Sequence, residues 1–489
     1  MFNVVGQAMS SATIAFQQEW SYYLVGLQLL YNPWRSINGG HHSNNTQGSH
    51  PPPLQLNIQL HPEEHAGRPP TTHFLHWRAN SGYRRPDGVR KYVFLINDQF
   101  PGPTVEVRSG DTVTISVDNE LEDEGLSIHW HGLHMRNANL MDGVAGVTQC
   151  DILPAASFVY NFTISADQSG TFWYHAHSST QRADGLYGGF VVHKPFSRPT
   201  SRSAGSSDAA ASEAFKHGYE KDVLLLIGDW YHRQARDVLS WYMRAGSFGN
   251  EPVPDSLVIN GIGHFDCSNA VPARPVDCID SSNFSHRPYL YLDPRIAYRV
   301  RVINTGSLAG FTLRFARETL QLIHLDGGIP VELQPDQNDV ASAGILFPGQ
   351  RMDFVLRRRE IHSMQHSKDP SSSLTVELDR SYPNPALTPR QIFPIIITAN
   401  VDNRRKAPET TTNTTNNKNK YRQVDIDISR VPSASSVLAL LPAKAHETHV
   451  VYTKIEKLSR NHNVPYGFIN RTCWRPQRDP PRPLIGLPR

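Results

Sequence analysis

Two long series of short segments, in which apolar and polar residues alternate, constrain the fold of this 489-residue chain more than any other feature. The first series begins at Thr71 and includes THFLHWRAN, RKYVFLIND and TVEVRSGDTVTISVDNEL. The second begins at Asp222 with DVLLLIGDWY. Successive side chains of a strand point to opposite faces, so this alternation is typical of half-buried strands. Turn residues such as PGPT and SGD separate the segments, and the pattern predicts an all-β protein built from sandwiches.

Changes in composition divide the chain into six parts. The two strand series have a similar texture, which indicates duplication of one sandwich unit. Runs rich in Ser and Ala, or in Asn, Thr and Lys, predict linkers, and a His-, Asn-, Gly- and Pro-rich lead-in predicts disorder. The expected parts are a disordered segment (1–70), domain 1 (71–196), a linker (197–221), domain 2 (222–400), a low-complexity linker (401–445) and the start of a third domain (446–489).

Charge, apolar runs and cysteine usage limit the class of protein. The net charge is +3, and no dense Lys/Arg stripe with interleaved aromatic residues occurs, which argues against nucleic acid as a partner. The apolar patch at 22–30 is too short for a clear membrane span, and no clear signal peptide precedes it. Five Asn-x-Ser/Thr sequons favour a secreted glycoprotein. The four cysteines allow three pairings into two disulfides: Cys150, Cys267, Cys278 and Cys473.

Two His-x-His pairs in aromatic strand segments are the main candidates for a metal site. IHWHG contains His129 and His131, and FWYHAH contains His175 and His177. Residues two apart on a strand leave the same face, so two such strands side by side present four imidazoles to one cavity. Imidazole suits copper, zinc, iron and nickel, and spacing alone does not choose among them. His134 lies an odd number of residues from His131, past a glycine, and is not expected to be a ligand.

The two segments around these pairs, SIHWHGLHMRNANLMDGVAGVTQC and GTFWYHAHSSTQRADGLYGGFVVH, closely resemble the first two copper signatures of multicopper oxidases. This group includes laccases, ascorbate oxidases and fungal ferroxidases. The resemblance extends over roughly 75–400, with further matches at GDWYH, DSLVINGIG, RVRVINTG, HLDG and PGQRMDFVL. It implies tandem cupredoxin-like Greek-key β-sandwich domains and copper as the metal.

The resemblance also assigns roles to individual residues. His129 matches the type 2 copper ligand, and His131, His175 and His177 match type 3 ligands. Asp142, in LMDGV, matches a carboxylate that helps to move protons during oxygen reduction, although an Asp-Gly turn is also an ordinary structural feature. Cys150 matches a disulfide cysteine, with Cys267 or Cys278 as its partner.

The implied reaction takes single electrons from a small reducing substrate at a blue (type 1) copper and passes them to a cluster that reduces dioxygen to water. The substrate stays open among phenols, ascorbate and metal ions. Asp229, in GDWYH, stands where fungal ferroxidases carry a glutamate, and a carboxylate that caps the strand end is the alternative interpretation.

The sequence departs from the family at its third domain. Signatures of the HPxHxHGH and HCHxxxH kind do not occur, so the type 1 ligands and half of the cluster histidines cannot be placed. We therefore expect a C-terminally truncated, laccase-like chain without turnover on its own. A non-catalytic copper-binding or interaction protein is the alternative, and a zinc hydrolase is disfavoured because no positioned Glu accompanies the histidine pairs.

Overall fold

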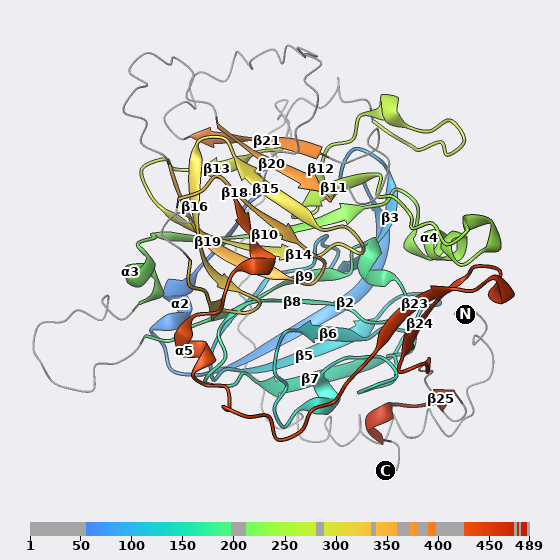
Figure 1. The fold of residues 1–489 in the computed structure, drawn as a ribbon, viewed down its shortest axis with the longest axis horizontal. Helices are drawn as coiled ribbons and strands as arrows, with labels where there is room; N and C mark the ends of the chain where they lie inside the picture. The colour runs from blue at the N-terminus through green and yellow to red at the C-terminus, as the bar shows by residue number, and fades with distance from the viewer. Residues whose placement is uncertain are drawn as a thin grey trace, which may run out of the picture. The chain divides into compact units, whose positions relative to one another are not determined.

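The computed structural model describes residues 55–196, 212–279, 288–333, 339–358, 372–379, 390–397, 425–473, 477–478 and 481–486. Strands dominate these residues and form two sandwiches in tandem, which confirms the prediction of an all-β fold. Figure 1 shows the strands of the first sandwich in blue to teal and most strands of the second in green to orange. Among the described residues, no helix has the length and apolar character needed to cross a membrane.

The first sandwich consists of two four-stranded sheets, ordered β3-β2-β5-β7 and β4-β9-β8-β6. The alternating sequence explains why they form, because β5 buries every second residue and its valines and isoleucine point into the sandwich. Two short 3-10 helices, η1 (Asn139–Met141) and η2 (Gln181–Asp184), lie in its connections. The strands are β2 (Thr72–Arg84), β3 (Lys91–Ile96), β4 (Val105–Arg108), β5 (Thr112–Asn119), β6 (Ile128–His131), β7 (Ser157–Thr163), β8 (Gly170–Ala176) and β9 (Tyr187–His193).

The second sandwich pairs an eight-stranded sheet with a six-stranded sheet. In the larger sheet, β12-β11-β10-β14-β19-β16-β17 follow one another and β1 pairs with β10; the smaller sheet is ordered β13-β21-β20-β15-β18-β22. The strands of the larger sheet are β1 (Ile58–Leu60), β10 (Lys221–Trp230), β11 (Ser256–Ile259), β12 (Ile262–Gly263), β14 (Tyr298–Asn304), β16 (Glu318–Leu325), β17 (Ile329–Pro330) and β19 (Arg351–Arg358). Those of the smaller sheet are β13 (Leu290–Leu292), β15 (Phe311–Phe315), β18 (Ser342–Leu346), β20 (Ser372–Leu378), β21 (Arg390–Ile397) and β22 (Ile426–Asp427).

The two sandwiches share an apolar interface. Trp173 on β8 and Tyr187 on β9 pack against Leu224 and Leu226 on β10. Figure 1 shows these three strands close together with β14, which carries Ile303 into the same cluster. The apolar run VLLLI of β10 is continuous rather than alternating because β10 is buried on both faces.

Three predicted boundaries were wrong in part. Residues 55–70, predicted to be disordered, include β1 and helix α2 (Pro62–Ala66). The end of the predicted 197–221 linker forms helix α3 (Glu213–His217) and the first residue of β10. The end of the predicted 401–445 linker forms β22, η9 (Ile428–Arg430) and α5 (Ser435–Leu438), because Ile426 and Ile428 are buried in the core of the second sandwich. The remainder of these three segments includes long stretches outside the described residues.

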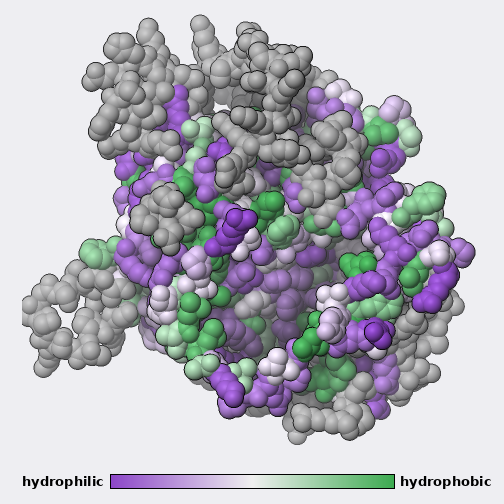
Figure 2. Space-filling model, viewed as in Figure 1, coloured by the Kyte–Doolittle hydropathy of each residue, from purple (hydrophilic) through white to green (hydrophobic). Residues whose placement is uncertain are grey.

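The C-terminal part forms a hairpin of β23 (Thr453–Lys457) and β24 (Pro465–Ile469) and a small pair of β25 (Gln477–Arg478) and β26 (Pro481–Arg482). Three of its apolar side chains, those of Tyr452, Ile455 and Ile469, are exposed. On the face shown in Figure 2, such hydrophobic residues are interspersed among hydrophilic ones. That this segment begins a third sandwich stays a prediction. The remaining elements are α4 (Ala235–Tyr242), η4 (Ala245–Ser247), η5 (Cys267–Asn269), η10 (Ser459–Asn461) and η11 (Leu484–Gly486).

The cysteine pairing differs from the expectation. Cys267 and Cys278 form a disulfide with each other, so neither is the partner of Cys150. They are 11 residues apart, and a loop between β12 and β13 brings them together. Cys150 and Cys473 lie exposed at the surface, away from this disulfide.

Candidate metal centre

Strands β6 and β8 bring the two His-x-His pairs together. They are antiparallel neighbours, and His129 lies directly opposite His175 in the register. The intervening Trp130 points the other way and is fully buried in the core of the first sandwich, where its ring contacts those of Tyr160 and Phe162. The aromatic residue between the histidines therefore fixes which face of β6 carries the imidazoles.

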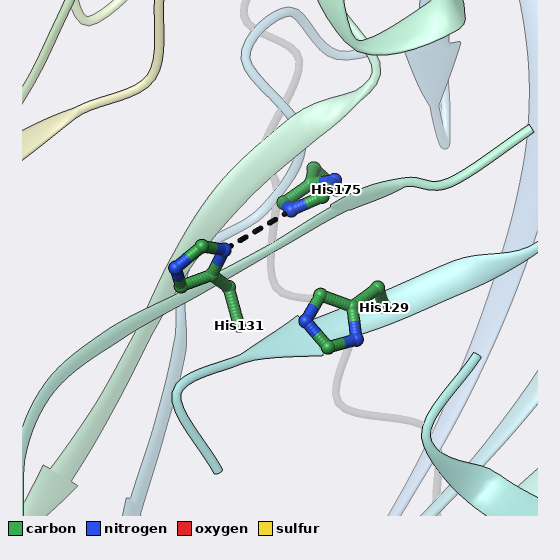
Figure 3. A group of neighbouring side chains, drawn as sticks. All are labelled: His129, His131 and His175. Atoms are coloured by element: carbon green, nitrogen blue, oxygen red, sulfur yellow. Dashed lines mark hydrogen bonds between the residues drawn. The ribbon is translucent and has the colours of Figure 1, made fainter. Parts of the chain in front are cut away.

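Three of the four imidazoles converge, as Figure 3 shows. His129, His131 and His175 each offer a ring nitrogen, and these nitrogens all lie within 4.8 Å of one another. His177 follows β8 directly, and its ring centroid lies 5.5 Å from that of His129 and 6.0 Å from that of His175. The pairing of β6 and β8 therefore places the four imidazoles close to one another, three of them within reach of one ion.

Hydrogen bonds orient two of these rings. Nδ1 of His129 lies 2.8 Å from the backbone carbonyl of Asp142, and Nδ1 of His175 lies 2.9 Å from the carbonyl of Ala176. Because a carbonyl can only accept, both Nδ1 atoms carry the proton and both Nε2 atoms keep a free lone pair. This arrangement around a histidine is typical of a metal ligand.

His131 presents the other ring nitrogen. Its Nδ1 lies 3.3 Å from Nε2 of His175, close enough for the two nitrogens to share one proton or one metal ion. On its far side, Gly349 approaches the ring so closely that a Cβ added there would lie 3.1 Å from Cε1 of His131. Gly349 has φ +86° and lies in the turn before β19, so the second sandwich closes the site from outside the first.

Burial and nearby charges keep the imidazoles of His131, His175 and His177 neutral. Burial, reinforced by the charge of Arg351, lowers the pKa of His131 to about 3. Burial also holds the pKa of His175 well below its usual range, with a further contribution from Arg182. The pKa of His177 is lowered by burial and by the neighbouring His129. Neutral imidazoles are the form that binds metal ions, so the cluster is ready for a metal at neutral pH.

Arg351 is a site residue that the sequence analysis did not identify. Its guanidinium donates to the carbonyls of Thr171 on β8 and Gly349. Gly132, the residue after the first histidine pair, has φ +90°, which favours glycine, and an added Cβ there would lie 2.5 Å from Nη2 of Arg351. PGQRMDFVL was noted for its family resemblance, but nothing in the sequence places it beside a strand of the other sandwich.

Other sequence candidates lie as follows. Oδ1 of Asp142 is 3.4 Å from Nδ1 of His129, farther than the backbone carbonyl of the same residue. His134 is exposed and stays outside the cluster, with its backbone N–H bonded to Gln168. Cys150 is an exposed thiol.

Asp229 caps a loop rather than facing the histidines. Its carboxylate accepts from the backbone N–H groups of three successive residues after β14, at 2.7–2.8 Å: Ser307, Leu308 and Ala309. Burial nonetheless raises its pKa. This geometry favours the capping interpretation of Asp229.

Comparison with known sequences identifies the family. Residues 78–197 and 221–362 match two family models, each described as multicopper oxidase, and together they cover more than half of the chain. The chain belongs to the multicopper oxidase family. Membership implies copper for the histidine cluster, because all four histidines lie within the first matched range.

Curated multicopper oxidases similar to this one differ in the activity that their names give. Laccase-1 of Cryptococcus neoformans is 31% identical, over 60% of this chain and 42% of the relative. The iron transport multicopper oxidase FET3 of Gibberella zeae is 34% identical, over 58% and 38%. L-ascorbate oxidase of Cucumis sativus is 33% identical, over 54% and 42%. This multicopper oxidase chain thus matches about two fifths of the length of these relatives.

Solved structures have the same fold. The crystal structure of Fet3p aligns with a TM-score of 0.61 and 22% identity, over 83% of this chain and 65% of that one. A laccase from Botrytis aclada aligns with a TM-score of 0.57 and 23% identity, over 83% and 64%. The two sandwiches are therefore cupredoxin-like domains, as the resemblance of this multicopper oxidase predicted.

Proposed function

We propose that His129, His131, His175 and His177 hold copper as the first half of a cluster that reduces dioxygen to water with electrons from a small substrate. In this proposal His129 binds the type 2 copper and the other three bind type 3 copper. The observation that carries it is the convergence of three imidazole nitrogens from two paired strands within 4.8 Å. The four imidazoles form a donor set that copper accepts.

The bound copper would supply one-electron redox chemistry to dioxygen, and the chain would supply geometry and proton handling. The carbonyl of Asp142 holds the His129 ring with Nε2 free, and the Asp142 carboxylate, 3.4 Å from the same ring, accepts and releases protons beside the cluster. Arg351 and Gly349 enclose His131, so the second sandwich limits the access of water to that ring.

We further propose that this chain alone does not turn over. A blue-copper site needs two histidines and a cysteine thiolate. None of the three potential metal-binding groups among the described residues includes a cysteine. The sequence contains no HCH motif in which a thiolate would bridge two histidines. The same observations favour, as a second candidate, a non-catalytic copper-binding or interaction protein derived from this family.

Three relatives named for different activities leave the reducing substrate open among phenols, ascorbate and iron. Asp229 gives no support to iron, because its carboxylate is already engaged by three backbone N–H groups. The disulfide between Cys267 and Cys278 supports our proposal of the secretory pathway, since disulfides persist in oxidising compartments.

Copper content and activity test this proposal separately. We expect the purified chain reconstituted with copper to bind it, to show no blue-copper absorption and to leave phenols unoxidised. The double variant H131A/H177A should lose the copper, whereas H134A, which changes an exposed histidine of the same segment, should retain it. Unchanged copper content in H131A/H177A would contradict the ligand assignment, and a blue, active chain would contradict the proposed lack of turnover.

A further inference from the structure

A second group of potential metal ligands lies at helix α3, outside the matched ranges 78–197 and 221–362 except for one member. Glu213 and His217 are the first and last residues of α3, one turn apart, and therefore share a face of the helix. His324 reaches toward them from β16, and its Nε2 lies 3.6 Å from Oε2 of Glu213. One ligand atom from each of the three residues lies within 4.8 Å of the other two.

The facing atoms in this group lack hydrogen bonds among the described residues. Nε2 of His217 is buried and has no partner. The 3.6 Å between His324 and Glu213 is too long for a hydrogen bond, and Oε2 of Glu213 lies 3.7 Å from the guanidinium of Arg299. Buried polar atoms almost always have a partner, and a metal ion bound between this nitrogen, the carboxylate and the second imidazole would provide one.

A comparable group elsewhere shows the contrast. His65, Glu106 and His193 also place their ligand atoms within 4.8 Å. There, however, Glu106 accepts from His193 at 2.8 Å and from the backbone N–H of His61 at 2.8 Å, and Nδ1 of His65 accepts from Arg68. That group is a closed hydrogen-bond network that needs no ion.

We propose that Glu213, His217 and His324 bind a divalent transition-metal ion, Zn²⁺ by preference, at a site separate from the copper cluster. Two imidazoles and one carboxylate form a known zinc donor set that leaves a fourth position open. Bonds of about 2.0–2.1 Å in tetrahedral geometry place neighbouring ligand atoms about 3.4 Å apart, close to the observed 3.6 Å. Small side-chain movements would close the remaining distances.

The charges around the site give the three ligands the protonation states that bind a metal ion. Burial, together with the charge of Arg299, lowers the pKa of His324 to about 4, and burial lowers the pKa of His217. Burial raises the pKa of Glu213, but Arg299 together with His324, Lys194 and His217 outweighs this effect, and the net shift is downward. The ligands are therefore neutral imidazoles and an ionised carboxylate. Lys194 also contacts Glu213, through Oε1, and leaves Oε2 to the metal.

Arg299 is the nearest competing cation, and Asp353 offsets it. Nη2 of Arg299 lies 3.3 Å from Nδ1 of His324 and 2.6 Å from Oδ2 of Asp353. In this structure Nδ1 of His324 accepts from Arg299, so a metal on Nε2 requires the ring proton to move to Nδ1 and the Arg299 guanidinium to turn away from it. Oδ2 of Asp353, 3.8 Å from Nδ1, would then have to approach to accept that proton. A carboxylate behind the metal-bound histidine is a common supporting arrangement. The bound ion would fasten the end of the 197–221 connection to the second sandwich.

Zinc titration of the full chain against a chromogenic chelator tests this site. Wild type should bind one more Zn²⁺ per chain than H217Q or E213Q, or bind it at least about tenfold more tightly. H65Q, in the hydrogen-bonded group of His65, Glu106 and His193, is the matched control and should keep the wild-type zinc content. Repeating the titration in the H131A/H177A background removes zinc uptake by the histidine cluster on β6 and β8.

Thermal melting distinguishes a loss of zinc binding from a loss of folding stability. In chelator, H217Q should melt at the wild-type temperature, because the variant loses no hydrogen bond from Nε2. Added Zn²⁺ should raise the melting temperature of wild type and not that of H217Q. Equal zinc affinity and equal zinc-induced shifts in both proteins would overturn the proposal, and neither result bears on the copper content of the other site.

Discussion

Substituting Gly349 by alanine tests whether the second sandwich shapes the proposed copper cluster of the first. At φ +86°, an L side chain is strained by about 1–2 kcal/mol. The new Cβ would also lie 3.1 Å from Cε1 of His131, so the imidazole must move by a few tenths of an ångström. Because Nδ1 of His131 lies 3.3 Å from Nε2 of His175, this displacement changes the distance between two proposed ligands.

Gly110→Ala provides a matched control. Gly110 has the same φ of +86°, and its added Cβ would lie 3.3 Å from a side-chain atom, but that atom belongs to Pro70. We expect both variants to lose about 1–2 kcal/mol in urea unfolding. Only G349A should also bind copper more weakly, by about tenfold, in competition with a chelator. Equal copper affinity in the two variants would refute the reasoning that Gly349 positions His131.

Three further predictions concern two buried carboxylates, Asp229 and Asp353, and Asp142, the residue proposed to handle protons. Asp229→Ala removes the acceptor of three backbone N–H groups and should lower the free energy of unfolding, measured in urea, by at least about 3 kcal/mol. Asp229→Asn keeps an acceptor oxygen and should lose less, so a smaller loss for Asp229→Ala than for Asp229→Asn would contradict the capping role. Burial raises the pKa of Asp353, but Arg299 and Arg301 outweigh it and lower the pKa from 3.8 to about 2. The folded state therefore gains about 2 kcal/mol from this group above pH 3.8, and the gain is lost as the pH falls toward 2. In acid unfolding, the D353N variant should lack this pH-dependent loss of stability. An acid-unfolding profile equal to that of wild type would contradict the contribution assigned to Asp353. The Asp142→Asn variant of this chain should keep its copper, because the backbone carbonyl holds His129. The matching substitution in a complete, active enzyme of the family should slow oxygen reduction. Loss of copper from the Asp142→Asn variant would show that the carboxylate, not the carbonyl, holds the ring.

Much of the fold was open to prediction because strand alternation is a local property. The side chains of β5 alternate between core and surface as the sequence does, and the i, i+2 spacing of His129 and His131 places both imidazoles opposite Trp130. Local spacing also separated His134 from this pair, since a ligand on the same face must lie an even number of residues away.

Nonlocal contacts were not predictable in the same way. The cysteines allowed three pairings, and only the loop between β12 and β13 selects Cys267 with Cys278. The Ser/Ala-rich composition before Lys221 gave no indication that α3 would dock on β16, because helix formation there depends on packing against the second sandwich.

For the candidate site itself, the sequence determined the four imidazoles and the face of each strand that carries them. The tertiary structure decided the rest: the register that sets His129 opposite His175, the carbonyl that orients His129, and the approach of Gly349 and Arg351 from another domain. The reason is physical. A strand fixes side-chain direction through its own backbone, whereas the distance between two ligands depends on strand pairing and domain packing across hundreds of residues.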